Sequence, residues 1–287
     1  RASDLRDEIA RGAGSTSFEA LARTFHSLAF SILNEKLRPE DPSYILISGA
    51  EQDAFIKDLL QNEHVKIDWH SDLELARKSR GFIREVRDLI SRATELDLTP
   101  RRLQELGEEL GEKYWDGGAK FWASYYKTMQ LRNHTVSDSP IRIDPSSVIV
   151  EAIDRLKSDP ELLAQYRSRF STIMIDEFQE SDASQRDLLA LIAPADVLLF
   201  ADPDSSVGRF RGADPDGLIG WMSDFCSESL HLPSVYRSVE SITDLAIATA
   251  SHFRSKNPAR AREKTPNVKL DRGVKLAKLS NQSEAAQ

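Results

Sequence analysis

The chain is poor in cysteine, with Cys226 alone among 287 residues. A single thiol excludes an intrachain disulfide and any cysteine-rich zinc or iron–sulfur site, so a reducing cytoplasm is the expected compartment. The sequence also has no long apolar run and no signal-like start. We therefore predict no association with a membrane.

A loop that binds phosphates is also missing. Such a loop needs glycines whose amides surround the phosphates, followed by a lysine and a hydroxyl residue. Residues 12–16 read Gly-Ala-Gly-Ser-Thr, which supplies glycines but no lysine. This stretch is predicted to be a surface loop.

The rest of the composition is ordinary for a globular protein. Hydrophobic residues make up 40% and charged residues 29%, and the length suits about two domains. The formal net charge of −8 argues against indiscriminate binding of polyanions by the whole surface. Residues 254–278 differ, with nine basic against two acidic residues, and are predicted to be a solvated tail or a linker that also meets phosphates.

The most informative segment is an apolar run that ends in two carboxylates. Residues 173–175 read Ile-Met-Ile, which predicts a buried strand of a parallel sheet, and Asp176 and Glu177 follow directly. Ligands bind at the carboxyl ends of such strands, where Asp176 would hold Mg²⁺ and Glu177 would polarise an attacking water. The alternative is a strand followed by an acidic turn or a helix start.

A second segment has the same form. Residues 197–200 read Val-Leu-Leu-Phe, and Asp202 and Asp204 follow. A helix-like stretch at 184–192 separates the two segments. Together they predict a strand, a crossover helix and a second parallel strand.

Four short motifs are informative together because of their order along the chain. They are Thr24-Phe25-His26-Ser27, Asp176-Glu177-Phe178-Gln179, Asp202-Pro203-Asp204 with Phe210-Arg211-Gly212-Ala213, and Tyr236-Arg237. In this order the chain resembles the UvrD/Rep-type superfamily 1A DNA helicases, which are ATP-driven motors that translocate on single-stranded DNA.

The resemblance implies roles in nucleotide chemistry, with ATP and Mg²⁺ as cofactors. Asp176 and Glu177 correspond to the Walker B pair, a magnesium ligand and a catalytic acid or base. Gln179 corresponds to the glutamine that links the nucleotide state to the DNA-facing motifs. Tyr236 corresponds to the tyrosine that stacks near the adenine, and Arg237 to the arginine that reaches the γ-phosphate.

The resemblance also implies contacts with DNA. Asp202 belongs to the third motif, which runs between the ATP site and the DNA, and the resemblance implies that Asp202 binds the nucleotide cofactor together with Tyr236 and Arg237. The residues implied to meet DNA are Thr24, Phe25, His26, Ser27, Phe210 and Arg211. Single-stranded DNA or a DNA junction is therefore the expected partner, and DNA repair or recombination is the expected process. A second helicase or nuclease subunit is a further expected partner.

The third motif departs from the family pattern. Ser205 stands where glutamine is usual, and Gly208 where an aromatic ring is usual; Ala201 and Val235 also differ. A stacked ring contributes roughly 1–3 kcal/mol per base, which Gly208 cannot supply. These departures keep open a second hypothesis, a degenerate, non-hydrolysing DNA-binding or scaffold subunit of a helicase–nuclease complex. A P-loop enzyme acting on small molecules is a third, which the motifs at 24–29 and 210–213 disfavour.

The predicted fold class is α/β. It is an incomplete RecA-like parallel-sheet domain of the P-loop NTPase type with an all-α insertion like the 1B subdomain of the family. The predicted division is 1–38 for the first part of domain 1A, 39–142 for the insertion, 143–260 for the rest of 1A, and 261–287 for a linker or the start of domain 2A. Because the family's phosphate loop precedes the first motif present here, we expect an internal fragment that hydrolyses little ATP by itself.

Two features of the predicted insertion could meet nucleic acid. Arg77, Arg80, Arg84 and Arg87 share one helical face, which suits phosphates but also suits a solvated, ion-paired surface. An aromatic stretch follows at 114–126, where core packing is predicted for Phe121, Trp122 and Tyr125. Helices are predicted at 101–112 and 119–131, joined by a turn at 116–118.

Overall fold

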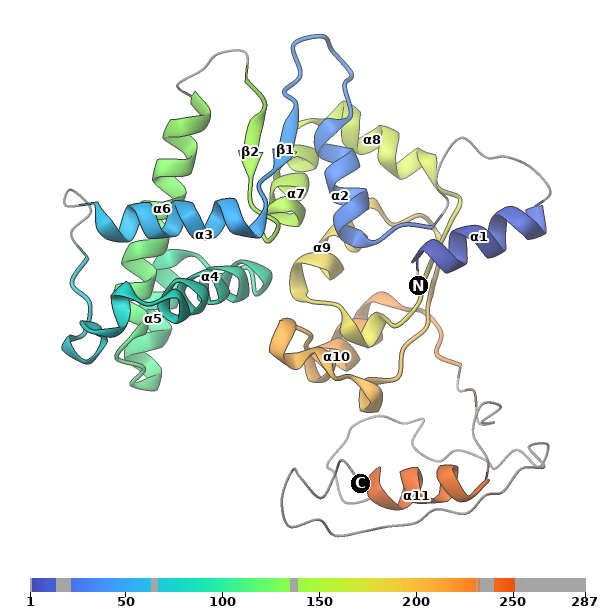
Figure 1. Cartoon of the computed structure of the whole chain (residues 1–287). Coiled ribbons are helices and arrows are strands. Elements are labelled where there is room, and N and C mark those ends of the chain that lie inside the picture. Colours follow the sequence, from blue (N-terminus) through green and yellow to red (C-terminus); the bar gives the residue numbers. More distant parts are fainter. Residues whose placement is uncertain are drawn as a thin grey trace.

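The computed structural model describes residues 2–13, 22–62, 67–134, 139–230, 232 and 240–250. Most of the described elements form two lobes, the core lobe and the helical lobe, joined by the strands β1 (Tyr44–Leu46) and β2 (Ile141–Ile143) (Figure 1). Two further helices are α1 (Ala2–Ala13) and α11 (Glu240–Ala250). In the described ranges no helix is both long enough and apolar enough to cross a membrane.

The core lobe carries the motif segments at 24–27, 176–179 and 202–213 and is built from short parallel strands and surrounding helices. Its α-helices are α2 (Phe25–Asn34), α7 (Val148–Ser158), α8 (Pro160–Arg169), α9 (Ala183–Ile192) and α10 (Pro215–Phe225). Its strands are β3 (Thr172–Ile175) and β4 (Asp196–Leu199), and its 3₁₀ turns are η3 (Phe178–Glu180), η4 (Pro203–Ser205) and η5 (Gly208–Arg211).

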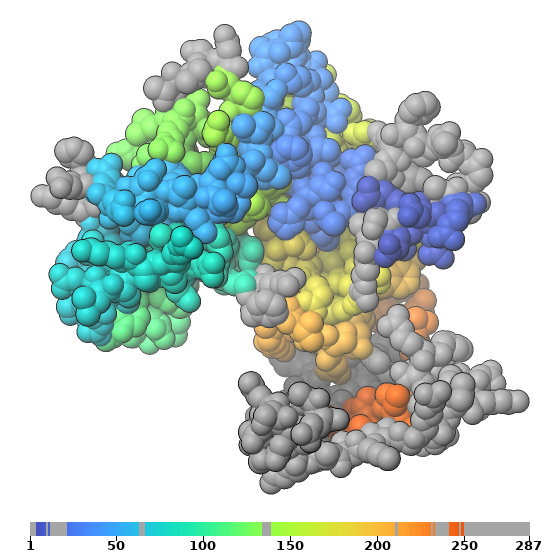
Figure 2. Space-filling view, viewed as in Figure 1, coloured from blue at the N-terminus to red at the C-terminus, as the bar shows by residue number. Residues whose placement is uncertain are grey.

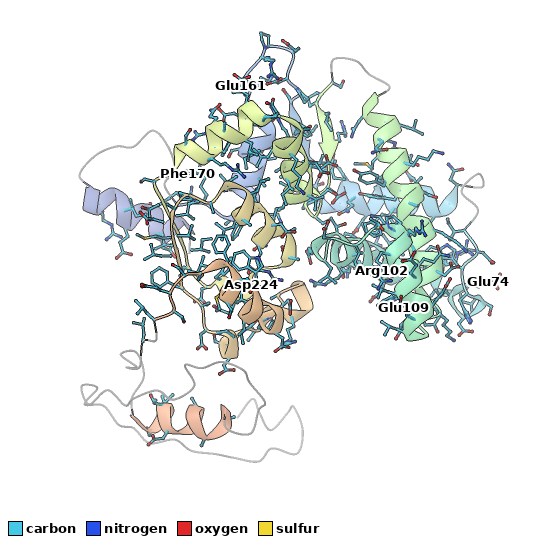
Figure 3. The ribbon with its side chains drawn as sticks, turned by 180° about the vertical axis from the view of Figure 1, so that it is seen from behind. Glu74, Arg102, Glu109, Glu161, Phe170 and Asp224 are labelled. Carbon is cyan, nitrogen blue, oxygen red and sulfur yellow. The ribbon has the colours of Figure 1, made fainter. Side chains whose placement is uncertain are left out.

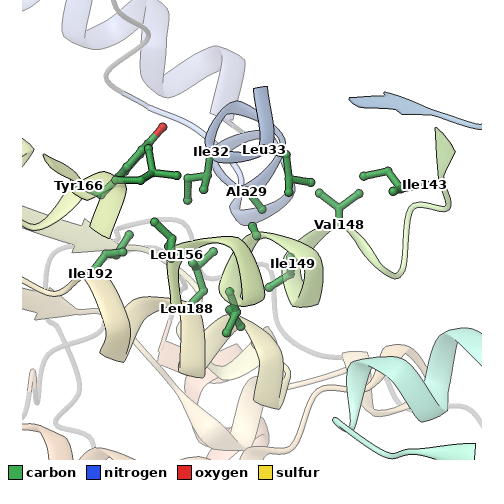
Figure 4. Close-up of a cluster of buried hydrophobic side chains, with 13 residues drawn as sticks. Ala29, Ile32, Leu33, Ile143, Val148, Ile149, Leu156, Tyr166, Leu188 and Ile192 are labelled. Carbon is green, nitrogen blue, oxygen red and sulfur yellow. The ribbon is translucent and has the colours of Figure 1, made fainter. Parts of the chain in front are cut away.

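A buried apolar cluster holds α2 against α7, α8 and α9 (Figure 4). Ile32 of α2 and Leu156 of α7 are fully buried there, and Leu188 joins them from α9. The helical spacing of apolar residues at 148–156 predicts this buried stripe, and its burial is confirmed. The cluster fixes the start of α2 relative to the strand ends.

The helical lobe has a core of its own. Its helices are α3 (Gly49–Gln61), α4 (Arg80–Glu95), α5 (Pro100–Leu110) and α6 (Trp115–His134), with 3₁₀ turns η1 (Ser71–Leu73) and η2 (Ala76–Lys78). Phe121, Trp122 and Tyr125 are buried, as predicted, and pack with Phe55 and Phe82. Seen from behind, Glu74 and Glu109 lie on this lobe, well away from Glu161 and Phe170 of the core lobe (Figure 3).

The predicted turn at 116–118 is wrong, because these residues lie inside α6. The two glycines serve close packing instead. A Cβ on Gly117 would lie 2.9 Å from Cε3 of Trp69, and one on Gly118 would lie 2.3 Å from Cδ2 of Leu89. Their missing side chains therefore let two large side chains of the lobe approach the helix.

Local capping signals define several helix starts. Ser48 and Glu51 form the reciprocal capping box that the sequence predicts for α3. Pro100 occupies the first turn of α5, where its missing N–H costs no hydrogen bond, and the Thr99 hydroxyl accepts the backbone N–H of Arg102 at 3.2 Å.

The described strands form two separate two-stranded parallel sheets. In one, Tyr44 pairs with Ile141; in the other, Thr172 pairs with Asp196. The prediction that β3 is buried on both faces is wrong for the described chain, since Met174 is 67% exposed. Its other face packs on the apolar cluster around Phe178, whereas the face that carries Thr172 and Met174 is exposed.

Candidate functional site

The carboxyl ends of β3 and β4 lie side by side. Ile175 pairs with Leu199, and the pairing continues beyond the strands, because the backbone N–H of Phe200 donates to the carbonyl of Ile175 at 2.8 Å. The N–H of Phe178 then donates to the carbonyl of Phe200 at 2.9 Å. The two predicted acidic segments are thus brought to one edge of the sheet.

The turn after β3 holds the two predicted carboxylates. Asp176 is exposed, and its Oδ1 accepts the backbone N–H of Glu177 at 3.0 Å. Glu177 has a left-handed backbone, with φ of 54° and ψ of 39°, which costs a non-glycine residue roughly 1–2 kcal/mol. Its carboxylate accepts a hydrogen bond from the side-chain amide of Gln179. Strain of this kind concentrates at functional sites.

Gln179 connects the two strand ends. Its side chain is 2% exposed, and its amide oxygen accepts the backbone N–H of Asp202 at 3.0 Å. Its amide nitrogen donates to Glu177 and, at 3.3 Å, to the hydroxyl of Ser205. The Ser205 hydroxyl in turn donates to the Asp202 carbonyl at 2.8 Å. One buried amide therefore ties the carboxylate of the first segment to the backbone of the second.

Glu180 accounts for the glycine at position 208. Its Oε1 accepts the backbone N–H of Val207 at 2.9 Å. A Cβ built on Gly208 would lie only 1.9 Å from Oε2 of Glu180 and 3.2 Å from Cβ of Ala213. In this chain a carboxylate from the 177–180 turn occupies the space that a side chain at 208 would need.

The first motif forms the start of α2. The Thr24 hydroxyl caps the helix by accepting the backbone N–H of Ser27 at 3.1 Å. His26 and Ser27 are exposed, whereas Phe25 is half-buried and packs against two buried apolar clusters, the one around Ile32 and the one around Phe178. The neighbouring protein desolvates the inner part of the exposed His26 side chain and so lowers its pKa, although the nearby Asp182 carboxylate opposes this shift.

Asp182 was not among the predicted site residues, yet it interacts with several elements around the site. It is 4% exposed and caps α9, where its Oδ1 accepts the backbone N–H of Gln185 at 2.8 Å. Its charge acts on His26 of α2 and on Glu95 at the end of α4. The sequence pattern of an Asp before a helix could have identified the cap, but no local signal shows its neighbours across the lobes.

Some predicted positions are not described. Tyr236 and Arg237 lie outside the described residues, and so does the basic stretch at 254–278. Phe210 and Arg211 have a described backbone in η5, but their side chains lie outside the description. Their roles stay predictions.

Asp176 fits a magnesium ion that arrives with phosphates. Mg²⁺ in such sites keeps several waters and is held by one or two carboxylates together with substrate phosphates. Across the described residues, no group of three or more His, Cys, Asp or Glu side chains could hold a metal ion without such a ligand. Within the same residues the Oδ2 atom of Asp176 has no hydrogen-bond partner, so it can face a ligand.

Comparison with known proteins gives one consistent result. Residues 1–225 match the family model described as the UvrD/REP helicase N-terminal domain. The ATP-dependent DNA helicase PcrA of Staphylococcus aureus strain Mu50 is 22% identical over 263 residues, which cover 90% of this chain and 33% of that protein. PcrA of Staphylococcus epidermidis strain ATCC 35984 is 24% identical over 241 residues, 82% of this chain and 30% of that protein.

The chain thus spans about a third of the length of the curated relatives it matches. The matched family region includes both strand ends, the Gln179 network and the start of α2. On the strength of a match over most of its length, this chain belongs to the UvrD/Rep helicase family, within its N-terminal domain.

Proposed function

We propose that the chain is part of an ATP-dependent motor that moves along single-stranded DNA, acting in DNA repair or recombination. One observation carries the proposal: buried Gln179 joins Glu177 of the first strand end to Asp202 of the second. The same strand ends lie beside the start of α2, since Phe25 packs on the cluster that contains Ile175. The residues for nucleotide chemistry and those for DNA contact would then lie at the same edge of the β3–β4 sheet.

In this proposal each described side chain has a distinct task. Asp176 holds Mg²⁺, which would neutralise charge on the transferred phosphoryl group when it is bound. Glu177 polarises the attacking water, and its half-buried carboxylate is oriented by the Gln179 amide. Arg237, Tyr236 and the third-motif residues Phe210 and Arg211 keep the roles that the family resemblance implies.

The helical lobe is proposed to be the 1B-like insertion of the motor. It leaves the core lobe after β1 and returns through β2, so the two lobes share this parallel pair. The domain division at 39–142 is part of the same proposal. The fragment alone is proposed to hydrolyse little or no ATP, because no glycine-rich loop with a lysine is present among its 287 residues.

The decisive experiment measures magnesium-dependent ATP hydrolysis by the whole natural protein, with and without single-stranded DNA. Glu177→Gln should abolish DNA-stimulated turnover, because the amide cannot accept a proton from water. Glu161→Gln is the matched control, since its side chain is 72% exposed on α8. Stimulated turnover that survives in the Glu177 variant would refute the assignment.

A second function is favoured by a specific observation. The Ser205 hydroxyl is used within the Gln179 network, and Gly208 has no room for a stacking ring. A degenerate DNA-binding subunit of a helicase–nuclease complex would retain both features. Salt-sensitive DNA binding by the whole protein without any ATP turnover would support this alternative.

A further inference from the structure

The two lobes meet at a junction between the end of α4 and the third-motif segment. In the space-filling view the helical lobe lies beside the core lobe (Figure 2). A Cβ on Gly212 would lie 2.8 Å from Oε2 of Glu95 and 3.5 Å from Nη1 of Arg92. Gly212 itself has a φ of +92°, which favours glycine there. The last turn of α4 therefore rests on this glycine.

The charged pair at this junction is partly open to solvent. Nη1 of Arg92 donates to Oε2 of Glu95 at 2.9 Å, with the side chains 35% and 25% exposed. Within the described chain this is the only hydrogen bond of the Arg92 guanidinium, so its other N–H groups remain available. A guanidinium presents five donors in a planar fork that suits phosphate.

Glu95 is placed where a carboxylate is poorly stabilised. It is the last residue of α4, and the carboxyl end of a helix disfavours an anion. Burial raises the pKa of Glu95, and the carboxylates of Asp182 and Asp88 raise it further, against the lowering effect of Arg92. The Glu95 carboxylate is therefore a poorly stabilised partner for the Arg92 guanidinium.

The same junction faces the start of α2. Asp182 acts electrostatically on both Glu95 and His26, which places the end of α4 near the motif at 24–27. Three segments from both lobes therefore converge: the end of α4, the segment at 208–213 and the start of α2. The last two are the segments that the family resemblance assigns to DNA.

We infer that Arg92 contacts a phosphate of single-stranded DNA, and that this phosphate displaces Glu95 from the Arg92 guanidinium. The inference rests on the proposed function and adds a DNA contact from the helical lobe. It also gives Glu95 a role, as the carboxylate that holds Arg92 in place above Gly212 until DNA binds.

Two substitutions with opposite expected effects test the inference in the 287-residue chain. Arg92→Ala should weaken binding of a single-stranded oligonucleotide roughly five- to tenfold, and it should lower the salt slope of log K by about 0.7. Glu95→Gln keeps the shape of the side chain but removes its charge, so binding should tighten about twofold. A gain in affinity cannot arise from misfolding.

Matched controls separate a local exchange from a general change of charge. Glu85→Gln removes a carboxylate from an exposed site on the same helix, and Arg101→Ala removes an arginine that is 88% exposed on α5. Neither should change the affinity. In the Arg92→Ala background, Glu95→Gln should bring no gain, because no guanidinium remains to be released.

The outcomes distinguish the inference from the proposed function. Binding by the parent chain that is unchanged in both junction variants would overturn the inference and leave the proposed function intact. An equal gain from Glu85→Gln would also overturn it, since the effect would then be a general one. Complete absence of DNA binding by the unsubstituted chain at low salt would overturn the inference, whereas the proposed function is decided by the ATP turnover of the whole protein.

Discussion

Gly208 offers a direct test of the contact between the two strand ends. Gly208→Ala places a Cβ 1.9 Å from Oε2 of Glu180, far inside van der Waals contact, so the Glu180 side chain has to move. The hydrogen bond from the Val207 N–H to Oε1, now 2.9 Å, is then lost. Ala213, at 3.2 Å, limits any shift in the opposite direction.

The expected cost follows from two opposing terms. A hydrogen bond to a charged group contributes about 1.5–3 kcal/mol, and the lower end applies here because Val207 is exposed and its N–H can bind water. Replacing glycine by alanine lowers the entropy of the unfolded chain, which stabilises the folded variant by roughly 0.5 kcal/mol. The free energy of unfolding should therefore fall by about 1 kcal/mol.

Urea denaturation of the variant measures this change through the midpoint, with an unchanged slope. Gly220→Ala is the matched control: Gly220 lies inside α10, where a new Cβ meets nothing within 4 Å, so this variant should be more stable than the parent. In a Glu180→Ala background, Gly208→Ala should cost nothing. If Gly208→Ala behaves like Gly220→Ala, Glu180 does not occupy the space beside position 208.

Three further predictions concern stability. Leu156→Ala removes a fully buried side chain from the core lobe and should lower the free energy of unfolding by about 2–5 kcal/mol in urea denaturation, whereas Leu110→Ala, at a 65% exposed site, should change it little. Thr99→Ala removes the cap of α5 and should cost about 1 kcal/mol in the same assay, and Thr99→Ser should restore most of it. Burial raises the pKa of Glu151 above its usual 4.5, so the folded chain binds more protons than the unfolded chain and Glu151 makes stability fall as the pH rises above that value. Glu151→Gln should flatten this part of the stability profile measured from pH 4 to pH 8, and an unchanged profile would contradict the assignment.

Local features of the fold could be predicted from the sequence because short-range physics determines them. The capping box at Ser48, the start of α5 at Pro100 and the apolar stripe of α7 depend on residues within one or two turns of each other. The two strands with a crossover helix were predictable for the same reason, since 173–175 and 197–200 are apolar runs that end in acids.

The errors arise where distant residues decide the outcome. The pair Gly117 and Gly118 reads locally as a turn, but Trp69 and Leu89 make it a site of close packing within α6. An apolar run such as that around Met174 predicts burial on both faces, yet the face that carries Met174 is exposed. In the candidate site, Asp176, Glu177 and Gln179 follow from the motif, whereas the contact of Glu180 with Val207 does not.

The two departures at Ser205 and Gly208 have a common structural origin. Ser205 accepts a hydrogen bond from Gln179, and Gly208 leaves space for Glu180, so both positions adapt to the same turn at 177–180. The third-motif segment therefore lies against the first strand end at both of these positions. An aromatic residue at 208 cannot be restored alone, because Glu180 occupies its space. We expect Gly208→Tyr to destabilise the chain in urea denaturation and Gly208→Tyr with Glu180→Ala to be tolerated, and equal stability of the two variants would show that the positions are independent.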